Sequence, residues 1–282
     1  MKTGIASCVL ERKFSVEEAM RVARDLGYVG YEIDVGPEPH YSIFGGETDL
    51  SRMRDFHRWN RLGQVAESVG IKICSICIGA LHSYGLADPN KEVRDQGISI
   101  LKTTCKAAAD IGVDKILVPF QQPADIEILV AQSYIIDSLK KCIDTAQEYG
   151  TLLAVENMPN DLYGPANKIV EVIEQIGSEY CQVYYDIANP EVKQIHAKDE
   201  IPILSNLIKQ VHIKDLKIKS SEGEIEVVNI GEGDLDLKSG IGALKGINYE
   251  GFVVVEVPTK ASDAFKAAEI NLKGLVTLFS TK

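Results

Sequence analysis

The sequence repeats one local pattern: an amphipathic stretch, then a glycine, then a short apolar run. A glycine directly after a helix can adopt the left-handed backbone conformation that closes the last helical turn. The apolar runs are about four to eight residues long and rich in Val, Ile and Leu, as strands buried on both faces must be. The glycines at these junctions are Gly27, Gly70, Gly112, Gly150 and Gly177. Helix and strand therefore alternate along the chain, which is typical of parallel strands joined by helical crossovers.

Apolar runs near both ends of the chain and after residue 209 extend the set of candidate strands to eight. The candidates are Ile5–Val9, Tyr28–Ile33, Ile71–Ile78, Val113–Phe120, Thr151–Val155, Gln182–Tyr185, Gln210–Ile213 and Gly251–Val257. Eight strand–helix units in 282 residues average about 35 residues each, which fits a (β/α)8 barrel of about 250 residues. The rival is an open doubly wound sheet, but Ser7–Glu11 has no G-x-G-x-x-G nucleotide loop. The sequence predicts an α/β fold, with residues 1–282 forming a single TIM-barrel domain.

Two irregular stretches follow the second and seventh predicted strands. Residues 36–53 contain Pro37 and Pro39 and are expected to form a long loop. Residues 214–237 contain Ser220–Gly223 between alternating residues, which predicts a hairpin within a second long loop. Both stretches follow the carboxyl ends of strands, and barrel active sites are built from the loops at that face.

The composition excludes several classes of protein. The chain carries 30 Lys plus Arg against 41 Asp plus Glu, a net charge of −11, whereas a long nucleic-acid surface needs clustered basic charge. No apolar run approaches the roughly 20 residues that span a bilayer, and no signal-peptide pattern is present at the start. The six cysteines lie in apolar or amphipathic segments, as expected of reduced core thiols. We therefore expect a cytoplasmic protein without nucleic-acid or membrane partners.

Four of the later predicted strands end in a charged or metal-ligating residue. These residues are Glu156, Asp186, His212 and Glu256. Because the carboxyl ends of neighbouring barrel strands converge on one opening, the four side chains are expected to surround one point. Three ionised carboxylates there would repel one another unless a cation lay between them. The sequence therefore predicts a divalent-metal site, for which the ligand types favour Mn²⁺ and leave Mg²⁺, Co²⁺ and Zn²⁺ open.

Five strings of residues extend this pattern to a known family. V-E-N-M-P, Y-Y-D-I-A-N, V-H-I-K-D, G-E-G-D-L-D and V-V-V-E-V resemble the xylose-isomerase-like barrel superfamily. This group includes sugar-phosphate isomerases and epimerases, free-ketose 3-epimerases, inosose dehydratases and endonuclease IV. The resemblance covers nearly the whole chain and implies that the four strand-end residues hold a divalent metal. It also implies that Glu156 and Glu256 act as acid and base, and that the protein is a homo-oligomer, either a dimer or a tetramer.

The chemistry expected of such a site is proton transfer next to a carbonyl. A metal that binds a ketose carbonyl and the neighbouring hydroxyl acts as a Lewis acid and stabilises the enediolate formed when a carboxylate removes the carbon-bound proton. A second carboxylate on the opposite face returns a proton. We therefore expect a metal-dependent sugar or sugar-phosphate isomerase or epimerase, with ketose 3-epimerisation as the favoured reaction.

Three other functions share part of this pattern of residues. A metal-dependent dehydratase of a cyclic keto-polyol needs the same base and metal but expels water, and it is the main alternative. An endonuclease-IV-like enzyme needs several more histidines for three zinc ions, whereas this chain has five histidines and only His212 is well placed. A barrel that only binds a ligand does not need the two strand-end glutamates.

The family resemblance also bears on the substrate. Free-ketose 3-epimerases usually carry His three residues after the metal Asp and Arg six residues after the metal His. Here these positions are Asn189 and Ile218, and the D-x-x-N string resembles the 3-epimerases of ketopentose phosphates. The sequence leaves the phosphorylation state of the sugar open. Asn189 is expected either to contact the substrate or to cap a helix before Pro190.

Further residues near strand ends are candidate pocket residues. Lys214 lies two residues after His212 and so on the same side of the strand, where it is expected to meet a substrate oxygen or to pair with a site carboxylate. Glu32 and His82 are expected to line the pocket. Gly231–Asp234 is expected to form a tight turn, with a backbone phosphate site as the alternative.

Overall fold

The structure is a computed structural model of the chain. It describes residues 1–11, 13–36, 56–119, 123, 125–161, 164–218, 225–258 and 262–281. The long loop predicted at 36–53 therefore lies outside the described residues, apart from Gly36.

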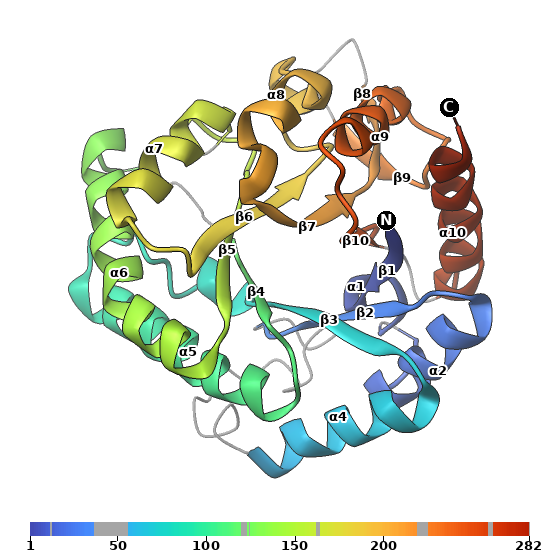
Figure 1. Cartoon of the computed structure of the whole chain (residues 1–282), viewed down its shortest axis with the longest axis horizontal. Helices are drawn as coiled ribbons and strands as arrows, with labels where there is room; N and C mark the ends of the chain where they lie inside the picture. Colours follow the sequence, from blue (N-terminus) through green and yellow to red (C-terminus); the bar gives the residue numbers. More distant parts are fainter. Residues whose placement is uncertain are drawn as a thin grey trace.

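Eight parallel strands close into a barrel, which confirms the predicted (β/α)8 fold (Figure 1). The order around the barrel is β1-β10-β7-β6-β5-β4-β3-β2. The strands are β1 Lys2–Ala6, β2 Gly30–Asp34, β3 Lys72–Cys77, β4 Lys115–Val118, β5 Leu152–Glu156, β6 Cys181–Asp186, β7 Ile208–Ile213 and β10 Phe252–Val255. Each of them overlaps one of the predicted strands.

Helices surround the barrel in the part of the chain that the structure describes (Figure 1). The α-helices are α1 Ser7–Leu10, α2 Val16–Leu26, α4 Phe56–Val69, α5 Lys91–Asp110, α6 Ile128–Tyr149, α7 Ala166–Ile176, α8 Ala197–Leu204, α9 Leu237–Gly246 and α10 Ala264–Ser280. The 3-10 helices are η1 Gly79–His82, η2 Pro190–Lys193 and η3 Ser205–Leu207. None of the helices among the described residues has both the length and the apolar character needed to cross a bilayer.

The five junction glycines adopt the predicted conformation. Their φ angles are positive and range from 64° at Gly150 to 111° at Gly27. Four of them directly follow a helix: Gly27 follows α2, Gly70 follows α4, Gly150 follows α6 and Gly177 follows α7. A side chain at a positive φ is strained, so glycine lets each helix end and the chain turn into the next strand.

The first strand begins earlier than the sequence predicted. The prediction was Ile5–Val9, whereas β1 ends at Ala6 and the next four residues form the short helix α1. Val9 and Leu10 are fully buried on this helix. A short buried apolar run has the same sequence pattern in a strand and in a helix, and this is why its local pattern was misleading.

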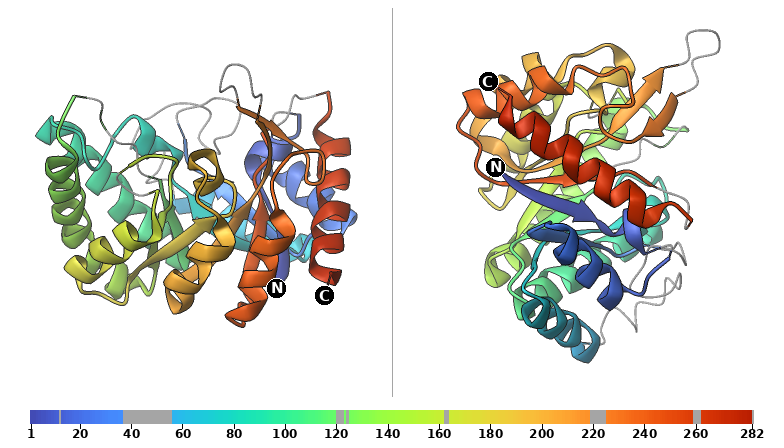
Figure 2. Two further views of the ribbon diagram at one scale, coloured as in Figure 1. Left: turned by 90° about the horizontal axis from the view of Figure 1, so that it is seen from above. Right: turned by 90° about the vertical axis from the view of Figure 1, so that its right-hand side faces the viewer.

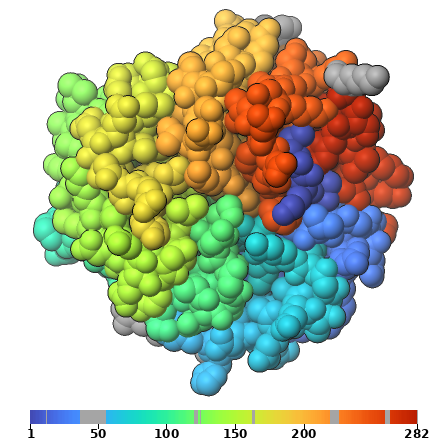
Figure 3. All heavy atoms as spheres, viewed as in Figure 1, coloured from blue at the N-terminus to red at the C-terminus, as the bar shows by residue number. Residues whose placement is uncertain are grey.

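The two ends of the chain meet where the barrel closes. β1 pairs with β10 on one side and with β2 on the other. Both termini lie at the same end of the barrel, where the strands begin (Figure 2). Figure 3 shows this face, with the first residues of the chain beside its last elements. The carboxyl ends of the strands therefore open at the opposite end.

A pair of antiparallel strands follows β7, within the stretch 214–237 where the sequence predicted a hairpin. β8 spans Asp215–Ile218 and β9 spans Ile225–Val228, and the two pair with each other rather than with the barrel. They lie at the end of the molecule opposite the termini (Figure 2). The chain between β8 and β9 lies outside the described residues.

The barrel interior departs from the usual apolar filling. Between strands and helices the core is apolar and continuous, as in other barrels. Inside the barrel, however, Glu32, Ser75 and Gln210 are all buried. Buried polar groups need hydrogen-bond partners, so this interior layer must form a network. That network lies directly under the candidate site.

Candidate metal centre

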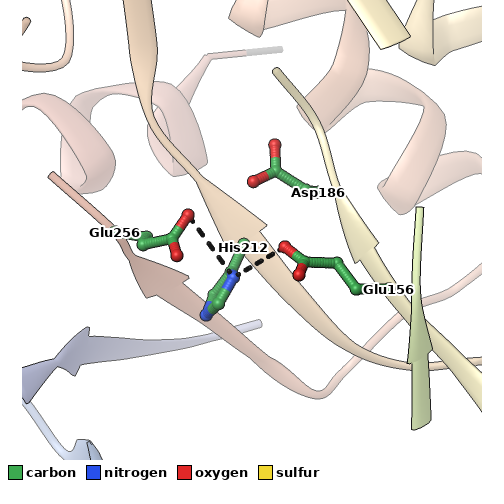
Figure 4. A group of neighbouring side chains, drawn as sticks. All are labelled: Glu156, Asp186, His212 and Glu256. Atoms are coloured by element: carbon green, nitrogen blue, oxygen red, sulfur yellow. Dashed lines mark ion pairs between the residues drawn. The ribbon is translucent and has the colours of Figure 1, made fainter. Parts of the chain in front are cut away.

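Four barrel strands end at one opening, and each contributes a side chain that can bind a metal. Glu156 ends β5, Asp186 ends β6, and His212 lies one residue before the end of β7. Glu256 follows β10, where its backbone N–H donates to the carbonyl of Ile213 at 3.0 Å. Figure 4 shows the four side chains converging from their strands.

The four side chains lie close enough to share one ion. One possible ligand atom from each can be chosen so that all four atoms lie within 4.8 Å of one another. Nδ1 of His212 is 3.5 Å from Oε1 of Glu156 and 3.7 Å from Oε2 of Glu256 (Figure 4). Asp186, His212 and Glu156 are buried, whereas the Glu256 side chain is 26% exposed. Solvent therefore reaches the cluster from the side of Glu256.

The donor set fits a divalent cation. Nδ1 of His212 is buried and has no hydrogen-bond partner among the described residues. A buried ring nitrogen is costly in that state unless an ion or a proton takes it. The most distant ligand atoms are separated by little more than two metal–oxygen bonds of about 2.1 Å. Three carboxylates and one imidazole suit the hard and borderline dications predicted from the sequence.

Lys214 places a positive charge beside the cluster. Its Nζ lies 2.7 Å from Oδ2 of Asp186 and donates a hydrogen bond of 2.6 Å to Oε2 of Glu256. Of the two contacts expected from the sequence, the structure therefore has the carboxylate pairing. Burial would lower the pKa of Lys214, but Asp186 and Glu256 raise it well above its ordinary value. The lysine consequently stays charged.

The two glutamates differ in their tendency to hold a proton. Burial raises the pKa of Glu156 to about 7, against the opposing effect of His212. Burial would also raise the pKa of Glu256, but Lys214 and His212 outweigh it and lower this pKa to about 2. Two carboxyl groups whose pKa values are driven apart can serve as one acid and one base.

A proton and a metal ion compete for His212. Burial would lower the pKa of this imidazole, but Glu32 and Glu256 raise it well above the ordinary value. Metal binding to a ring nitrogen requires that the nitrogen carry no proton. Metal affinity at this site should therefore decrease as the pH falls.

Asn157, which the sequence analysis did not single out, holds Asp186 in place. Its Nδ2 donates to the backbone carbonyl of Asp186 at 2.9 Å, and its Oδ1 accepts from the backbone N–H of Asp186 at 2.6 Å. Oδ1 of Asp186 accepts from the backbone N–H groups of Ala188 and Asn189, so Oδ2 is the oxygen left for the cluster. The signal was present in the string V-E-N-M-P, in which Asn157 directly follows a ligand.

Asn189 is buried next to Asp186 and Asn157. The sequence left open a substrate contact or a helix cap. Its side chain makes no cap hydrogen bond to η2, although η2 begins directly after it. Instead Nδ2 donates to the backbone carbonyl of Asn157 at 2.9 Å. The amide donor therefore supports the chain next to two cluster residues.

Glu32 lies below the cluster instead of lining the opening as expected. It is only 2% exposed. Its Oε2 accepts hydrogen bonds from Ser75 and Tyr184, each at 2.6 Å, and its Oε1 is 2.7 Å from Nε2 of His212. Because these buried groups occupy both oxygens, the side chain is turned toward the imidazole and not toward solvent.

His82 ends η1, the 3-10 helix that follows β3, and its side chain is exposed. Desolvation by its surroundings lowers the pKa of this imidazole, and the Glu256 carboxylate partly opposes that effect. Because η1 follows the carboxyl end of β3, His82 lies at the end of the barrel where the strands end, and its position in the pocket stays a prediction.

Asp34 is a further carboxyl group that the sequence analysis missed. It ends β2 and accepts a hydrogen bond of 3.2 Å from the backbone N–H of Gly79. Burial raises its pKa to about 7, and the charges of Glu32 and Glu256 add to the increase. It follows Glu32 by two residues, so strand alternation was a signal that could have identified it.

The glycine-rich loop at 231–235 encloses a carboxylate of this chain. Oδ2 of Asp215 accepts from the N–H groups of Gly231 and Gly233 at 2.9 and 3.1 Å, and Oδ1 accepts from that of Leu235. The two N–H groups between them donate to backbone carbonyls. The structure thus has the predicted turn, and the backbone donors of a phosphate site are already used.

Comparisons with known proteins identify relatives of the whole chain. A family model described as "Xylose isomerase-like TIM barrel" matches residues 20–275. The L-ribulose-5-phosphate 3-epimerase UlaE of Salmonella paratyphi C is 27% identical over 260 residues, which cover 90% of this chain and 85% of that protein. The protein of the same name from Shigella boydii is 28% identical over 261 residues with the same coverage.

Solved structures share the barrel. That of the 3-keto-D-glucoside 4-epimerase YcjR from E. coli has a TM-score of 0.78 and 19% identity, covering 98% of this chain and 99% of that one. A structure of L-ribulose 3-epimerase has a TM-score of 0.75 and 19% identity, covering 99% and 94%. At these identities the likeness shows the fold alone.

Proposed function

The chain belongs to the xylose isomerase-like TIM barrel family, and from that membership and its site we propose that it is a divalent-metal-dependent sugar epimerase. We propose 3-epimerisation of a ketose or ketose phosphate as the reaction. The observation that carries the proposal is the cluster at the strand ends, because it combines four ligands for one ion with two carboxyl groups of opposite proton affinity.

The proposed metal ligands are Glu156, Asp186, His212 and Glu256. A bound dication would supply the Lewis acidity that polarises a substrate carbonyl and stabilises the charge that develops beside it. We propose Mn²⁺, because carboxylate-rich ligation with a single imidazole suits it. The unpartnered Nδ1 of His212 supports an ion at this place.

The two glutamates are the proposed acid and base. We propose that Glu256, which Lys214 keeps ionised, removes a carbon-bound proton next to the carbonyl. We propose that Glu156, whose pKa is raised by burial, returns a proton. β5 and β10 lie on either side of β6 and β7 in the barrel, so the two carboxyl groups flank the cluster. Inversion at carbon needs such a pair on opposite faces, and the reverse reaction exchanges their roles.

The nature of the relatives supports the choice of substrate. The curated proteins named above are 3-epimerases of L-ribulose 5-phosphate, a ketopentose phosphate. Asn189 and Ile218 stand where free-ketose enzymes usually carry His and Arg. We therefore place ketopentose phosphates first among the candidates. Lys214, Asn189 and His82 are the proposed substrate contacts.

Three broader expectations accompany this proposal. Family resemblance supports a homo-oligomer of two or four chains that acts on a small sugar, and we propose the cytoplasm as its compartment. The continuous apolar core supports one barrel domain over the chain.

The proposal is tested by incubating the Mn²⁺-loaded protein with a panel of ketoses and ketose phosphates in D₂O. We expect deuterium at one carbon next to the carbonyl, both in the recovered substrate and in a product that has the same composition as the substrate. A product that has lost water would instead identify the dehydratase of a keto-polyol. A panel in which no ketose or keto-polyol takes up label would contradict proton transfer at this site.

A further inference from the structure

A buried polar layer lies directly beneath the four proposed ligands. It comprises Glu32 on β2, Ser75 on β3, Tyr184 on β6 and Gln210 on β7. We propose that Glu32 is a positioning residue: it fixes the ring and the tautomer of His212 so that Nδ1 presents its lone pair to the metal. This inference rests on the proposed metal site and extends it to a residue outside the ligand set.

The hydrogen bonds of the layer run in one direction toward Glu32. Nε2 of Gln210 donates to Oγ of Ser75 at 2.9 Å, and this leaves the hydroxyl proton of Ser75 for Oε2 of Glu32 at 2.6 Å. The phenol of Tyr184 donates to the same oxygen, also at 2.6 Å. Oε2 therefore has two donors, and Oε1 remains for the imidazole. An ionised carboxylate only accepts hydrogen bonds, so each partner must bring a proton.

This arrangement determines which ring nitrogen of His212 carries hydrogen. Nε2 lies 2.7 Å from Oε1 of Glu32 and must donate. In a neutral imidazole the other nitrogen then has a free lone pair. That nitrogen is Nδ1, which is buried, has no hydrogen-bond partner among the described residues, and lies 3.5 Å from Glu156. The observed geometry thus matches the carboxylate–histidine pair that orients a metal-binding imidazole.

The ring itself has little freedom to rotate. His212 is 1% exposed, and the Tyr184 ring packs against it with ring centroids 4.4 Å apart and planes inclined at 57°. Tyr184 thus holds one face of the ring and, through its phenol, one oxygen of Glu32. The negative charge of the Glu32 carboxylate next to Nε2 also makes Nδ1 a stronger ligand, and loss of such a partner typically costs about 10- to 100-fold in metal affinity.

The decisive measurement uses ¹¹³Cd²⁺ as the probe, with ¹⁵N-labelled histidine in the full chain. We expect cadmium coupling to Nδ1 of His212 and a directly bonded proton on Nε2. Coupling to Nε2, or a proton on Nδ1, would overturn the proposal. This spectrum of the wild-type protein needs no variant to fold and no substrate.

Two variants of the same network separate positioning from general structural support. Glu32→Gln keeps the shape but removes the charge, and it can turn its amide group toward Nε2. Tyr184→Phe removes one hydrogen bond to Glu32 and leaves the Oε1 contact with His212 in place. We expect the Mn²⁺ dissociation constant of Glu32→Gln to rise by about 10- to 100-fold, and that of Tyr184→Phe by less than about 3-fold.

The outcomes distinguish this inference from the proposed function. If the wild-type protein binds Mn²⁺ and Glu32→Gln binds it no more weakly than Tyr184→Phe does, the positioning role of Glu32 is wrong while the metal site stands. If the wild-type protein binds neither Mn²⁺ nor Cd²⁺, the metal site fails and the role of Glu32 fails with it.

Discussion

Glu156 and Glu256 share one buried cluster, yet Lys214 makes its hydrogen bond to Glu256. The ammonium group favours the charged form of Glu256, whereas burial, only partly opposed by His212, favours the neutral form of Glu156. At the scale of single residues, then, two identical side chains acquire different proton affinities from their neighbours.

Replacing either glutamate with Gln tests their proposed roles as acid and base. Glu156→Gln and Glu256→Gln remove the group that gives or takes the proton, so we expect solvent deuterium incorporation into the substrate to fall by at least about 100-fold. Glu174→Gln, on the exposed surface of α7, is the control and should exchange at the wild-type rate. Mass spectrometry of the recovered substrate measures the label, and retained exchange in both cluster variants contradicts the assignment.

Asn157 offers a test of how the cluster is held. Asn157→Ala leaves the backbone N–H and C=O of Asp186 without their side-chain partners, so we expect the free energy of unfolding to fall by about 1–3 kcal/mol. Asn206→Ala, at an exposed position in η3, should change it by no more than about 0.5 kcal/mol. Urea unfolding compares the two, and equal effects would show that the buried amide adds nothing.

Glu11 should make stability depend on pH. It accepts a hydrogen bond of 2.6 Å from Tyr31, and burial raises its pKa from 4.5 to about 8. Between these values the folded protein holds a proton that the unfolded chain has released, so stability falls as the pH rises. Glu11→Gln removes this ionisation. Between about pH 5 and pH 8 the free energy of unfolding of the variant should therefore rise relative to that of the wild type, by at most about 1.4 kcal/mol per pH unit. Urea unfolding of both proteins at the two pH values measures this change. A difference in free energy of unfolding that does not depend on pH contradicts the expectation.

At the scale of helices and strands, much of the barrel was predictable because its signals are local. A glycine that ends a helix and a short apolar run that follows it each occupy a few neighbouring residues, and Gly27, Gly150 and Gly177 do end their helices. The start of the chain was misjudged because Val9 and Leu10 are as apolar on a short helix as on a buried strand. Local pattern there does not distinguish the two.

The loop after β8 and β9 provides a test at this scale. A Cβ atom on Gly233 would overlap Oδ1 of Asp215, so Gly233→Ala should disrupt the turn around this carboxylate and lower the free energy of unfolding by at least about 1 kcal/mol. Gly242 lies in α9 with open space around it, and Gly242→Ala should raise stability by about 0.5–1 kcal/mol. Thermal unfolding of both variants measures the change in stability of each relative to the wild type. Two changes in the same direction contradict this explanation.

At the scale of the whole molecule, the barrel brings together residues that the sequence keeps far apart. The clustering of the four proposed ligands was predictable because each lies at the carboxyl end of a buried strand, and parallel strands of a barrel end at one face. The network beneath them was not. Glu32 and His212 are 180 positions apart, and irregular strand pairing beside Glu32 and beside Tyr184 shifts which residues face each other. Such shifts leave no local pattern, so the support of the ligands is visible only in three dimensions.

The central claim is that these remote side chains share one dication, and equilibrium dialysis of the purified protein against Mn²⁺ tests it most directly. We expect one tightly held ion per chain. Combined replacement of Asp186 by Asn and His212 by Gln should abolish that binding, because it removes one charge and the imidazole ligand. Wild-type protein that retains no more Mn²⁺ than this variant would contradict the account.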